Sequence, residues 1–397
     1  VRRTPEEELP GPALVAGRPQ PFGKPVDVLA DRALPELTPP ELTLDVELQH
    51  DTLLAMAWKR HHEEGCHDYA KSRTCRTNAA APTHLDAARV GASGLGIFQR
   101  STYPLAHALA PLSRLASLSK STLGGANLDA IIAAYTSEGW KCDRAALESL
   151  SSVRAPADVS LVQTVVKALY EPWLDASARH FQGLIASNES AARAMVVGTA
   201  VEKDVCVLFA DGLRFDIAGM LKERLEAKGL RTRLSHRLSP LPTVTATAKP
   251  FATVVHDLLQ GGADVVDFNP QLKGGGQSVT AQKLRDEMAK RGMDILGDET
   301  RPPKTGTTGA WVETGRLDEL GHKIQAQLAA HLDTEIETLV DQITGLLECG
   351  WLRVRVVTDH GWLLLPGGLP RVDLPVYLAA TKWARCATVK GDSKPSV

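Results

Sequence analysis

The fold is decided by one short stretch, VCVLFADG at residues 205–212. Its first six residues are all apolar, and an unbroken apolar run of this length predicts a strand buried on both faces of a sheet. The Asp-Gly pair ends the strand. Residues 213–228 then show a helical pattern, with Gly229 as the stop signal. A buried strand that passes directly into a helix is typical of an α/β fold.

Further strand and helix patterns follow this first pair along the chain. They predict strands at 231–237, 265–268 and 352–358, and helices near 250–260 and at 280–291 and 319–347. Alternating strands and helices imply right-handed crossovers, and therefore a mostly parallel sheet flanked by helices. In such a sheet, ligands bind beyond the carboxyl ends of the strands. Functional residues are therefore expected just after the predicted strands.

The chain before the first strand has a different composition. Residues 1–45 are rich in proline, which blocks helix formation and removes backbone donors, so we expect an extended tail there. Residues 46–199 are rich in Ala, Leu and Ser, and apolar residues recur at helical spacing at 128–135 and 161–173. We predict a helical domain over 46–199 that carries no catalytic residue. An α/β domain over 200–397 follows, and this domain either ends within the sequence or continues beyond Val397.

Composition argues against several functional classes. The chain has 45 Lys and Arg residues against 47 Asp and Glu residues, so its formal net charge is −2 and no global basic excess indicates nucleic-acid binding. No stretch approaches the ~18 consecutive apolar residues of a spanning helix, so we expect no membrane association. The six cysteines are scattered through a large chain. This favours free thiols in a reducing compartment, and we expect a cytoplasmic protein.

Residues of the metal-binding type lie just after two predicted strands and at the start of a predicted helix. Asp211 follows the first strand, and Asp359 and His360 follow the strand that ends at residue 358. Asp318 and His322 are four residues apart, so on a helix both side chains lie on one face, where they could share one metal ion. Together these groups favour a metal site at the carboxyl edge of the sheet. The alternative for each group taken alone is a simple turn at Asp359 and His360, and a solvated helix start at Asp318 and His322.

A threonine-rich segment, LPTVTATA at residues 241–248, lies between these groups. We place it on a turn before a helix at Pro250. A hydroxyl near a helix N-terminus is suited to phosphate, because unpaired backbone N–H groups and the positive end of the helix dipole point at it. A metal beside that hydroxyl would lower its pKa and make it a nucleophile. The alternative is that the threonines only cap the helix.

The order of these groups resembles the alkaline phosphatase superfamily, and most closely its PglZ family. The similarity lies in FADGLRFD at 209–216, LPTVT at 241–245, GRLDELGH at 315–322 and VTDHGWLLLPGGLP at 357–370. It covers about residues 200–380, roughly half of the chain. The resemblance implies an alkaline-phosphatase-like, mostly parallel sheet flanked by helices, with two divalent metals at its carboxyl edge.

The resemblance also implies roles for individual residues. One metal would be held by Asp211, Thr245, Asp359 and His360, and Thr245 would attack phosphorus. Thr243, two residues earlier, is the nearest rival as the nucleophile. Zinc is the metal that we expect first, although the donor set also suits Mn²⁺ and Mg²⁺.

A second metal would be held by Asp318 and His322. The superfamily pattern expects one more histidine on this metal, further toward the C-terminus, and none follows His360 in this sequence. Either a residue beyond Val397 completes this second site or the site is incomplete.

Two residues of the first motif complete the set of site residues. We expect Arg214 and Asp216, together with Thr243, to lie behind the metal ligands or against the substrate. Asp216 either orients Arg214 or is only a favourable charge in the first turn of its helix.

The resemblance defines the expected function. PglZ proteins belong to BREX phage-defence systems, which implies antiviral defence, other BREX subunits as partners, and a phosphate ester or nucleic-acid-related substrate. We expect a metal-dependent phosphohydrolase of the phosphatase or phosphodiesterase type. The alternative is a non-catalytic scaffold subunit whose phosphatase-like fold no longer turns over substrate.

A shared metal carries a geometric prediction. Asp211 and Asp359 can hold one ion at ~2.0–2.2 Å only if their strands are neighbours. His360 can join them only if the chain has left the pleat at Gly361, because side chains within a strand alternate between faces. Without metal, two carboxylates so close would repel each other, and the pKa of one would rise.

Overall fold

The computed structural model describes residues 105–188, 196, 198–240, 243–261, 268–275, 278–297 and 300–368, together with the backbone of 379–382 and 386–389. The expected tail at 1–45 lies outside these ranges. So do the part of the expected helical domain before residue 105 and most of the strand expected at 265–268.

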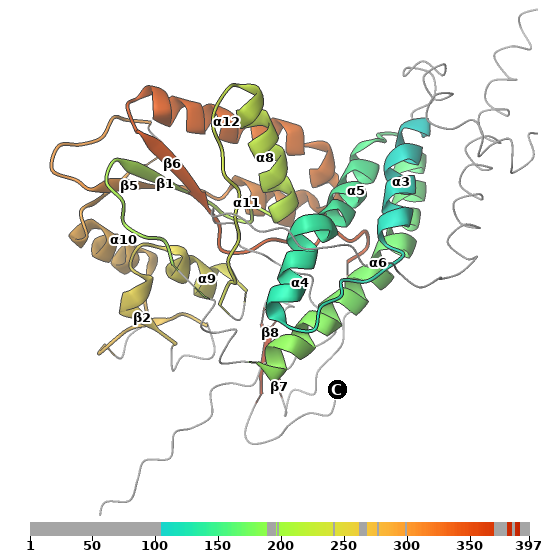
Figure 1. Ribbon diagram of the computed structural model, residues 1–397, viewed down its shortest axis with the longest axis horizontal. Helices are drawn as coiled ribbons and strands as arrows, with labels where there is room; N and C mark the ends of the chain where they lie inside the picture. Colours follow the sequence, from blue (N-terminus) through green and yellow to red (C-terminus); the bar gives the residue numbers. More distant parts are fainter. Residues whose placement is uncertain are drawn as a thin grey trace, which may run out of the picture.

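A four-stranded parallel sheet forms the centre of the described chain (Figure 1). In spatial order its strands are β4 (Met293–Ile295), β5 (Gly309–Thr314), β1 (Val205–Ala210) and β6 (Arg353–Val357). β1 pairs with β5 on one side and with β6 on the other. The expected α/β fold, a parallel sheet flanked by helices, is confirmed.

All six residues of β1 are buried, and they alternate between two cores. The even-numbered residues belong to a core shared with α8 (Phe215–Ala227) and α12 (Leu332–Glu348). The odd-numbered residues belong to a second core, shared with residues around α9 (Thr245–Ala252) and α10 (Ala281–Lys290). The sheet therefore lies between two helical layers, which is why β1 has no polar position.

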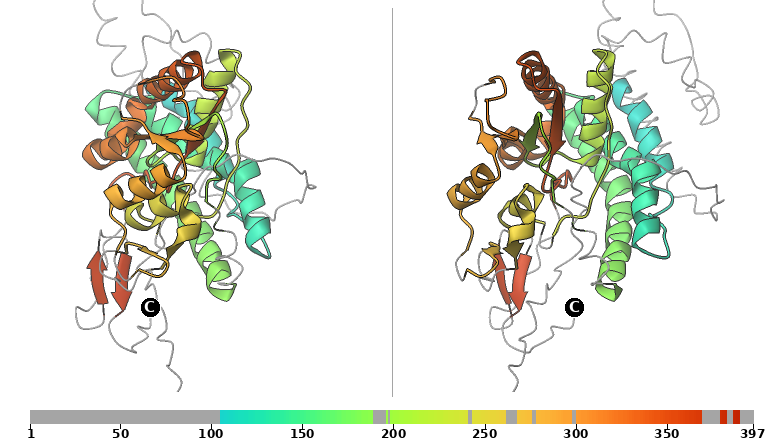
Figure 2. Two further views of the ribbon diagram at one scale, coloured as in Figure 1. Left: turned by 90° about the vertical axis from the view of Figure 1, so that its left-hand side faces the viewer. Right: turned by 60° about the vertical axis from the view of Figure 1, so that its left-hand side comes forward.

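The helices before β1 lie beyond α8, on the same side of the sheet (Figures 1 and 2). They are α3 (Ala106–Leu118), α4 (Leu128–Ala134), α5 (Trp140–Ser151) and α6 (Pro156–Ser187), with the π-helix η1 (Tyr135–Gly139) between α4 and α5. We call this group the helical layer. Its buried residues form one continuous core with those of α8 and the sheet. None of the described helices is both long and apolar enough to cross a membrane.

Several sequence predictions match the observed elements closely. The helix expected at 213–228 is α8, the helix at 280–291 is α10, and the strand at 352–358 is β6. The helix α10 begins where expected because the Thr280 side chain caps it, accepting a hydrogen bond of 3.2 Å from the backbone N–H of Lys283.

The single long helix expected at 319–347 is wrong. The chain forms α11 (Arg316–Ile324), a 3-10 segment η3 (Gln325–Ala330) and then α12. Gln325 has φ 46°, outside the right-handed helical region, so the α-helix cannot continue through it. The apolar spacing nevertheless continues, because Leu328 in η3 remains buried in the same core.

The helix expected near 250–260 is also corrected. It begins at Thr245 and ends at Ala252, and the 3-10 turn η2 (His256–Leu258) follows it. Pro250 lies inside α9 rather than at its start. The N–H groups in the first turn of an α-helix have no carbonyl partner within the helix. Pro250 lies just beyond that turn, so its missing N–H removes only about one helical hydrogen bond.

Strand assignments differ from the sequence prediction in two respects. The segment 231–237 forms no strand, and its Arg231 and Arg233 are exposed. The strands β4 and β5 were not predicted, because their apolar runs are too short to stand out. Two short antiparallel pairs lie outside the main sheet, formed by β2 (Leu259–Gln260) with β3 (Gln271–Leu272) and by β7 (Ala379–Lys382) with β8 (Cys386–Val389).

Candidate metal centre

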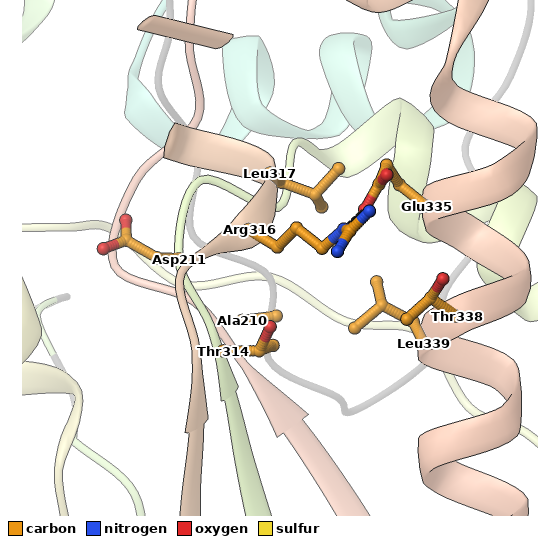
Figure 3. Close-up of a pocket in the computed structure, with 8 residues that line it drawn as sticks. All are labelled: Ala210, Asp211, Thr314, Arg316, Leu317, Glu335, Thr338 and Leu339. Atoms are coloured by element: carbon orange, nitrogen blue, oxygen red, sulfur yellow. Dashed lines mark hydrogen bonds and ion pairs between the residues drawn. The ribbon is translucent and has the colours of Figure 1, made fainter. Parts of the chain in front are cut away.

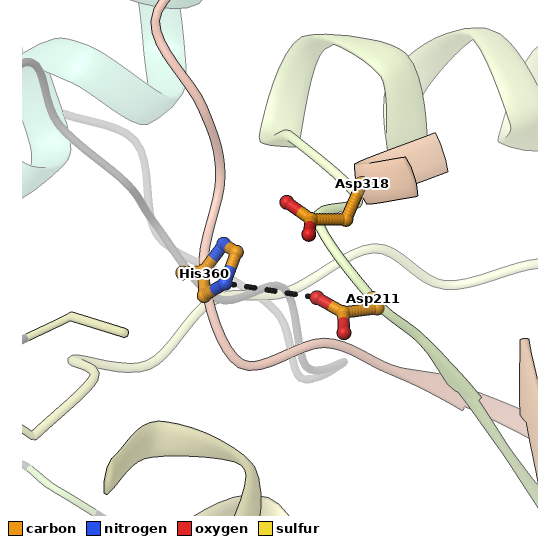
Figure 4. Close-up of side chains that lie close together, drawn as sticks. All are labelled: Asp211, Asp318 and His360. Carbon is orange, nitrogen blue, oxygen red and sulfur yellow. Dashed lines mark ion pairs between the residues drawn. The ribbon is translucent and has the colours of Figure 1, made fainter. Parts of the chain in front are cut away.

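Three side chains from distant parts of the sequence converge at the carboxyl edge of the sheet (Figure 4). Asp211 follows β1, Asp318 lies in the first turn of α11 just after β5, and His360 follows β6. One ligand atom of each residue lies within 4.8 Å of those of the other two. Because β5 and β6 both flank β1, the strand order itself brings the three residues together.

Asp211 points toward the α9 side of the sheet. It continues the odd-numbered face of β1, which packs on that side. A small pocket lies near the other side of the strand end, lined in part by Arg316, Leu317, Glu335, Thr338 and Leu339. In Figure 3 the carboxylate of Asp211 points away from these residues. Asp211 also lines this pocket, but its carboxylate is directed to the α9 side.

Asp359 and His360 lie in the turn after β6, and both are only 1% exposed. Thr358 fixes this turn against β1, since its hydroxyl accepts a 3.1 Å hydrogen bond from the N–H of Leu213 and donates one of 3.1 Å to the His360 carbonyl. Ser239 donates a 2.6 Å hydrogen bond to the Asp359 carbonyl. The backbone of the turn is thus held on both sides of the two ligands.

The contacts of His360 define which ring nitrogen is available. Its Nδ1 lies 3.0 Å from the carbonyl oxygen of Gly361, which can only accept, so Nδ1 carries the proton of a neutral ring and Nε2 carries the lone pair. The Thr245 hydroxyl lies 2.9 Å from Nε2 and donates to it. Nε2 also lies 3.6 Å from Asp211 Oδ1 and 3.7 Å from Asp359 Oδ2. A metal ion binds a neutral imidazole through this kind of lone pair.

The two carboxylates around His360 are electrostatically strained. Burial, together with the nearby charge of Asp359, raises the pKa of Asp211 to about 7. Burial likewise raises the pKa of Asp359 to about 7. β1 and β6 are neighbouring strands, as expected. The expected rise in a carboxyl pKa is found for both Asp211 and Asp359. Burial, rather than mutual repulsion, is the larger cause.

The donor set fits a divalent cation. Asp211 Oδ1 and Asp359 Oδ2 are both buried and have no hydrogen-bond partner. A buried carboxylate oxygen without a partner is costly, and a cation removes that cost. Carboxylates with one imidazole suit Zn²⁺, Mn²⁺ and Mg²⁺ alike, so the donor set alone does not select the metal.

Asp318 and His322 are the two ligands that the resemblance assigns to a second metal. Asp318 lies in one cluster with Asp211 and His360. His322 Nε2 lies 3.4 Å from Asp318 Oδ2, as their helical spacing predicts, but the His322 side chain is 71% exposed and outside the cluster of three. The structure thus brings five of the six predicted ligands to one edge and leaves His322 at its solvent side.

A glycine is required where Asp318 approaches Asp211. Gly212 has φ 72°, in the left-handed region that favours glycine. A Cβ atom built there would lie 3.2 Å from the Cβ of Asp318 and 3.3 Å from Cδ1 of Trp362. The Asp-Gly pair that ends β1 therefore does more than stop the strand, because it admits the first turn of α11.

The two threonines differ in position. Thr245 is the first residue of α9, and Val244 before it is extended. Thr243 lies two residues earlier, half-buried, in the approach to the helix. Of the two, Thr245 is the one whose hydroxyl reaches His360.

Sequence reasoning missed Lys249. It lies four residues after Thr245 and therefore on the same face of α9. Its Nζ lies 2.7 Å from Glu313 Oε2, at the end of β5, and 4.6 Å from the ring centre of Phe209 in β1. The spacing was visible in the sequence, but a helix start predicted at Pro250 placed Thr245 outside the helix.

Arg214 and Asp216 lie behind the ligands rather than among them. Both are buried, and Arg214 donates two hydrogen bonds of 2.9 Å to the Asp216 carboxylate. Asp216 therefore holds Arg214 in place, in addition to its position in the first turn of α8.

Comparison of the chain with models of known protein families gives no match, and no curated protein matches it significantly. The PglZ resemblance therefore rests on the four motifs, and what it implies about activity remains a prediction.

Proposed function

We propose that the chain is a metal-dependent phosphoric ester hydrolase in which Thr245 is the nucleophile. The observation that carries the proposal is the 2.9 Å contact between the Thr245 hydroxyl and His360 Nε2, beside Asp211 and Asp318. Thr245 is also the first residue of α9, where free backbone N–H groups favour an anion. A hydroxyl, a set of metal-type ligands and an anion-binding helix end thus meet.

Each residue has a defined role in this proposal. Asp211, Asp318, Asp359 and His360 would hold the cation. When bound, a divalent metal supplies positive charge that neutralises phosphoryl oxygens and lowers the pKa of the hydroxyl. The Thr245 oxygen forms a bond to phosphorus as the ester P–O bond breaks, and the hydroxyl proton ends on the released alcohol. Water then cleaves the phosphothreonine and restores the hydroxyl.

Lys249 would bind the remaining phosphoryl charge. Its side chain is 21% exposed and its ammonium is paired with Glu313, so it is already partly desolvated and fixed in position. Because Lys249 and Thr245 share a face of α9, the ammonium lies on the side from which the ester approaches the hydroxyl. Such a preorganised cation stabilises charge that develops on phosphoryl oxygens.

The setting that we propose follows the motifs. It is a BREX-like phage-defence system with other BREX subunits as partners, a phosphate ester or nucleic-acid-related substrate, a cytoplasmic location, and zinc as the first metal to test, before manganese and magnesium.

The test is hydrolysis of an aryl phosphodiester and an aryl phosphomonoester by the purified chain, after removal of metal and reloading with Zn²⁺, Mn²⁺ or Mg²⁺. We expect turnover that depends on added metal, and Thr245→Ala should lower it by about a thousandfold. Thr243→Ala is the matched control and should stay within a few-fold of the wild type. If Thr245→Ala keeps full metal-dependent turnover, the nucleophile is wrongly assigned.

A non-catalytic scaffold is the second candidate. It is favoured by His322, which is 71% exposed, and by the single group of converging ligands within the described ranges. In that case the chain would bind one metal ion, become more resistant to thermal unfolding, and hydrolyse neither ester with any of the three metals. The same assay therefore separates the two candidates.

A further inference from the structure

Arg214 lies behind the candidate metal centre, between two segments that carry its ligands. It follows Asp211 by three residues and precedes the first residue of α8. Its side chain is only 6% exposed, and its two hydrogen bonds to Asp216 are both 2.9 Å long. A bidentate pair of this kind fixes both the plane and the position of the guanidinium group.

One side of this guanidinium holds the loop that follows β6. Its carbon lies 4.8 Å from the ring centre of Trp362, and Nη1 donates a 3.4 Å hydrogen bond to the Trp362 carbonyl. Trp362 is two residues after His360, and its ring edge lies against Gly212, next to Asp211. Arg214 therefore holds the His360 loop against the Asp211 turn through one aromatic ring.

The guanidinium also faces the helical layer. Nη2 lies 4.0 Å from Oδ2 of Asp143, a buried residue of α5. Asp143 accepts hydrogen bonds from two buried phenols, from Tyr135 in the π-helix η1 at 2.5 Å and from Tyr170 in α6. Hydrogen bonds to a carboxylate are among the stronger ones in proteins, and π-helical turns are frequent at functional sites. An unbroken chain of buried polar contacts thus leads from α6 to the His360 loop.

We propose that Asp143, Tyr135 and Tyr170 are positioning residues for the metal centre, acting through Arg214 and Trp362 on the His360 loop. The helical layer then sets the geometry of ligands that other elements supply. The inference rests on the proposed function only in taking those ligands to hold a metal. A network that merely attached the helices to the sheet would, when broken, lower stability and leave the His360 loop as ordered as before.

Amide hydrogen exchange on the metal-free 397-residue chain tests the coupling directly. Tyr170→Phe removes one hydroxyl and keeps the ring, which stacks on Trp173 with centroids 5.7 Å apart. We expect peptides covering residues 356–366 to exchange about tenfold faster in this variant than in the wild type. Val166→Ala is the matched control, because Val166 is fully buried on the same helix and outside the network. Unchanged exchange in Tyr170→Phe, or equal acceleration in both variants, would overturn the proposal.

Zinc affinity, measured by competition with a chelator, gives the second readout. Tyr170→Phe should weaken it about tenfold, and Val166→Ala should leave it unchanged. Tyr135→Phe removes the other phenol and serves where Tyr170→Phe does not fold. If the wild type binds no metal while residues 356–366 still respond, the proposed function fails and the coupling stands. If the wild type binds zinc and the phenylalanine variants bind it equally well, the positioning role fails and the proposed function stands.

Discussion

Asp359 has one carboxylate oxygen that accepts a hydrogen bond from the His360 amide and another that is buried without a partner. Asparagine would keep the accepting oxygen and remove the charge. We expect Asp359→Asn to stabilise the metal-free protein at alkaline pH, by roughly 1–3 kcal/mol, and to abolish tight metal binding. Urea unfolding in a chelator measures the first effect, and zinc titration measures the second. A less stable metal-free variant with intact zinc affinity would mean that Asp359 only caps the turn.

The raised pKa values of Asp211 and Asp359, both about 7, give the metal-free protein a definite pH dependence. In the unfolded chain these groups titrate at about 3.9, so between about pH 4 and pH 7 the folded protein binds more protons than the unfolded chain does. The free energy of unfolding should therefore fall as pH rises through this window. Unfolding in urea and chelator across it measures the slope, which should be shallower in Asp211→Asn. A wild type that gains stability over the same interval would contradict these pKa values.

Lys249 can be tested without turnover. Lys249→Met removes the ammonium and leaves Glu313 paired with Arg285 at 3.2 Å. We expect inorganic phosphate to bind the zinc-loaded variant about tenfold more weakly, because one charge-assisted hydrogen bond is lost. Calorimetric titration measures this. Lys290→Met is the control, since Lys290 is 64% exposed on α10 and pairs only with a neighbour on its own helix. Equal phosphate affinity in both variants would remove Lys249 from the site.

The turn between β1 and α8 shows how one element constrains another. Gly212 and Gly229 both have positive φ, 72° and 82°, but only at Gly212 would a Cβ meet neighbouring atoms. Gly212→Ala and Gly229→Ala should each lose about 1 kcal/mol of stability to backbone strain, and Gly212→Ala should lose more. Only Gly212→Ala displaces Asp318, so only it should weaken zinc binding. Equal zinc affinity in the two variants would show that the approach of Asp318 is unimportant.

The break between α11 and α12 stores strain at one residue. Gln325 has φ 46° and ψ −123°, a conformation that glycine adopts far more readily. We expect Gln325→Gly to stabilise the protein by about 1 kcal/mol. Gln327→Gly, two residues later in η3 and also exposed, should instead destabilise it, because there glycine only adds chain entropy to the unfolded state. Urea denaturation of both variants distinguishes the two effects, which should have opposite signs.

The way in which an element is buried determines whether the sequence predicts it. β1 is buried on both faces and therefore appears as an unbroken apolar run. β5 is fully buried only over its first four residues, and only residues 310–312 form an apolar run, so it gave no comparable signal. The start of α9 was placed at Pro250 because proline favours the first helical turn, whereas the chain already turns helical at Thr245.

For the whole molecule, strand order decides the site. Motifs marked Asp211, Asp318 and His360 as ligands, but spacing along the chain says nothing about whether β5 and β6 lie on opposite sides of β1. The division into two metals is drawn from the resemblance and stays a prediction, while the structure brings ligand atoms of these three residues within 4.8 Å of one another. Lys249 belongs to none of the motifs. Its place near the candidate site becomes apparent only once Glu313 is known to lie beside it.

The relation of the helical layer to the sheet also becomes clear only from the whole molecule. It belongs to the helical domain expected over 46–199, and its buried residues form one continuous core with those of α8 and the sheet. A chain that began near residue 195 would expose that face of α8 and leave Arg214 without Asp143. We therefore expect the metal affinity to depend on the helices that precede β1.

The parallel pairing of β1 with both β5 and β6 has a consequence for when the proposed ligands come together. Val205 meets Gly309 and Arg353 only after the chain closes loops of roughly a hundred and a hundred and fifty residues. Pairings between such distant segments form slowly, after local helices. The ligands therefore assemble late in folding, and a chain still emerging from the ribosome has no cation trap until β6 is complete. Unlike a zinc finger, whose ion nucleates its fold, a cation at the proposed centre would be loaded only once the protein is folded.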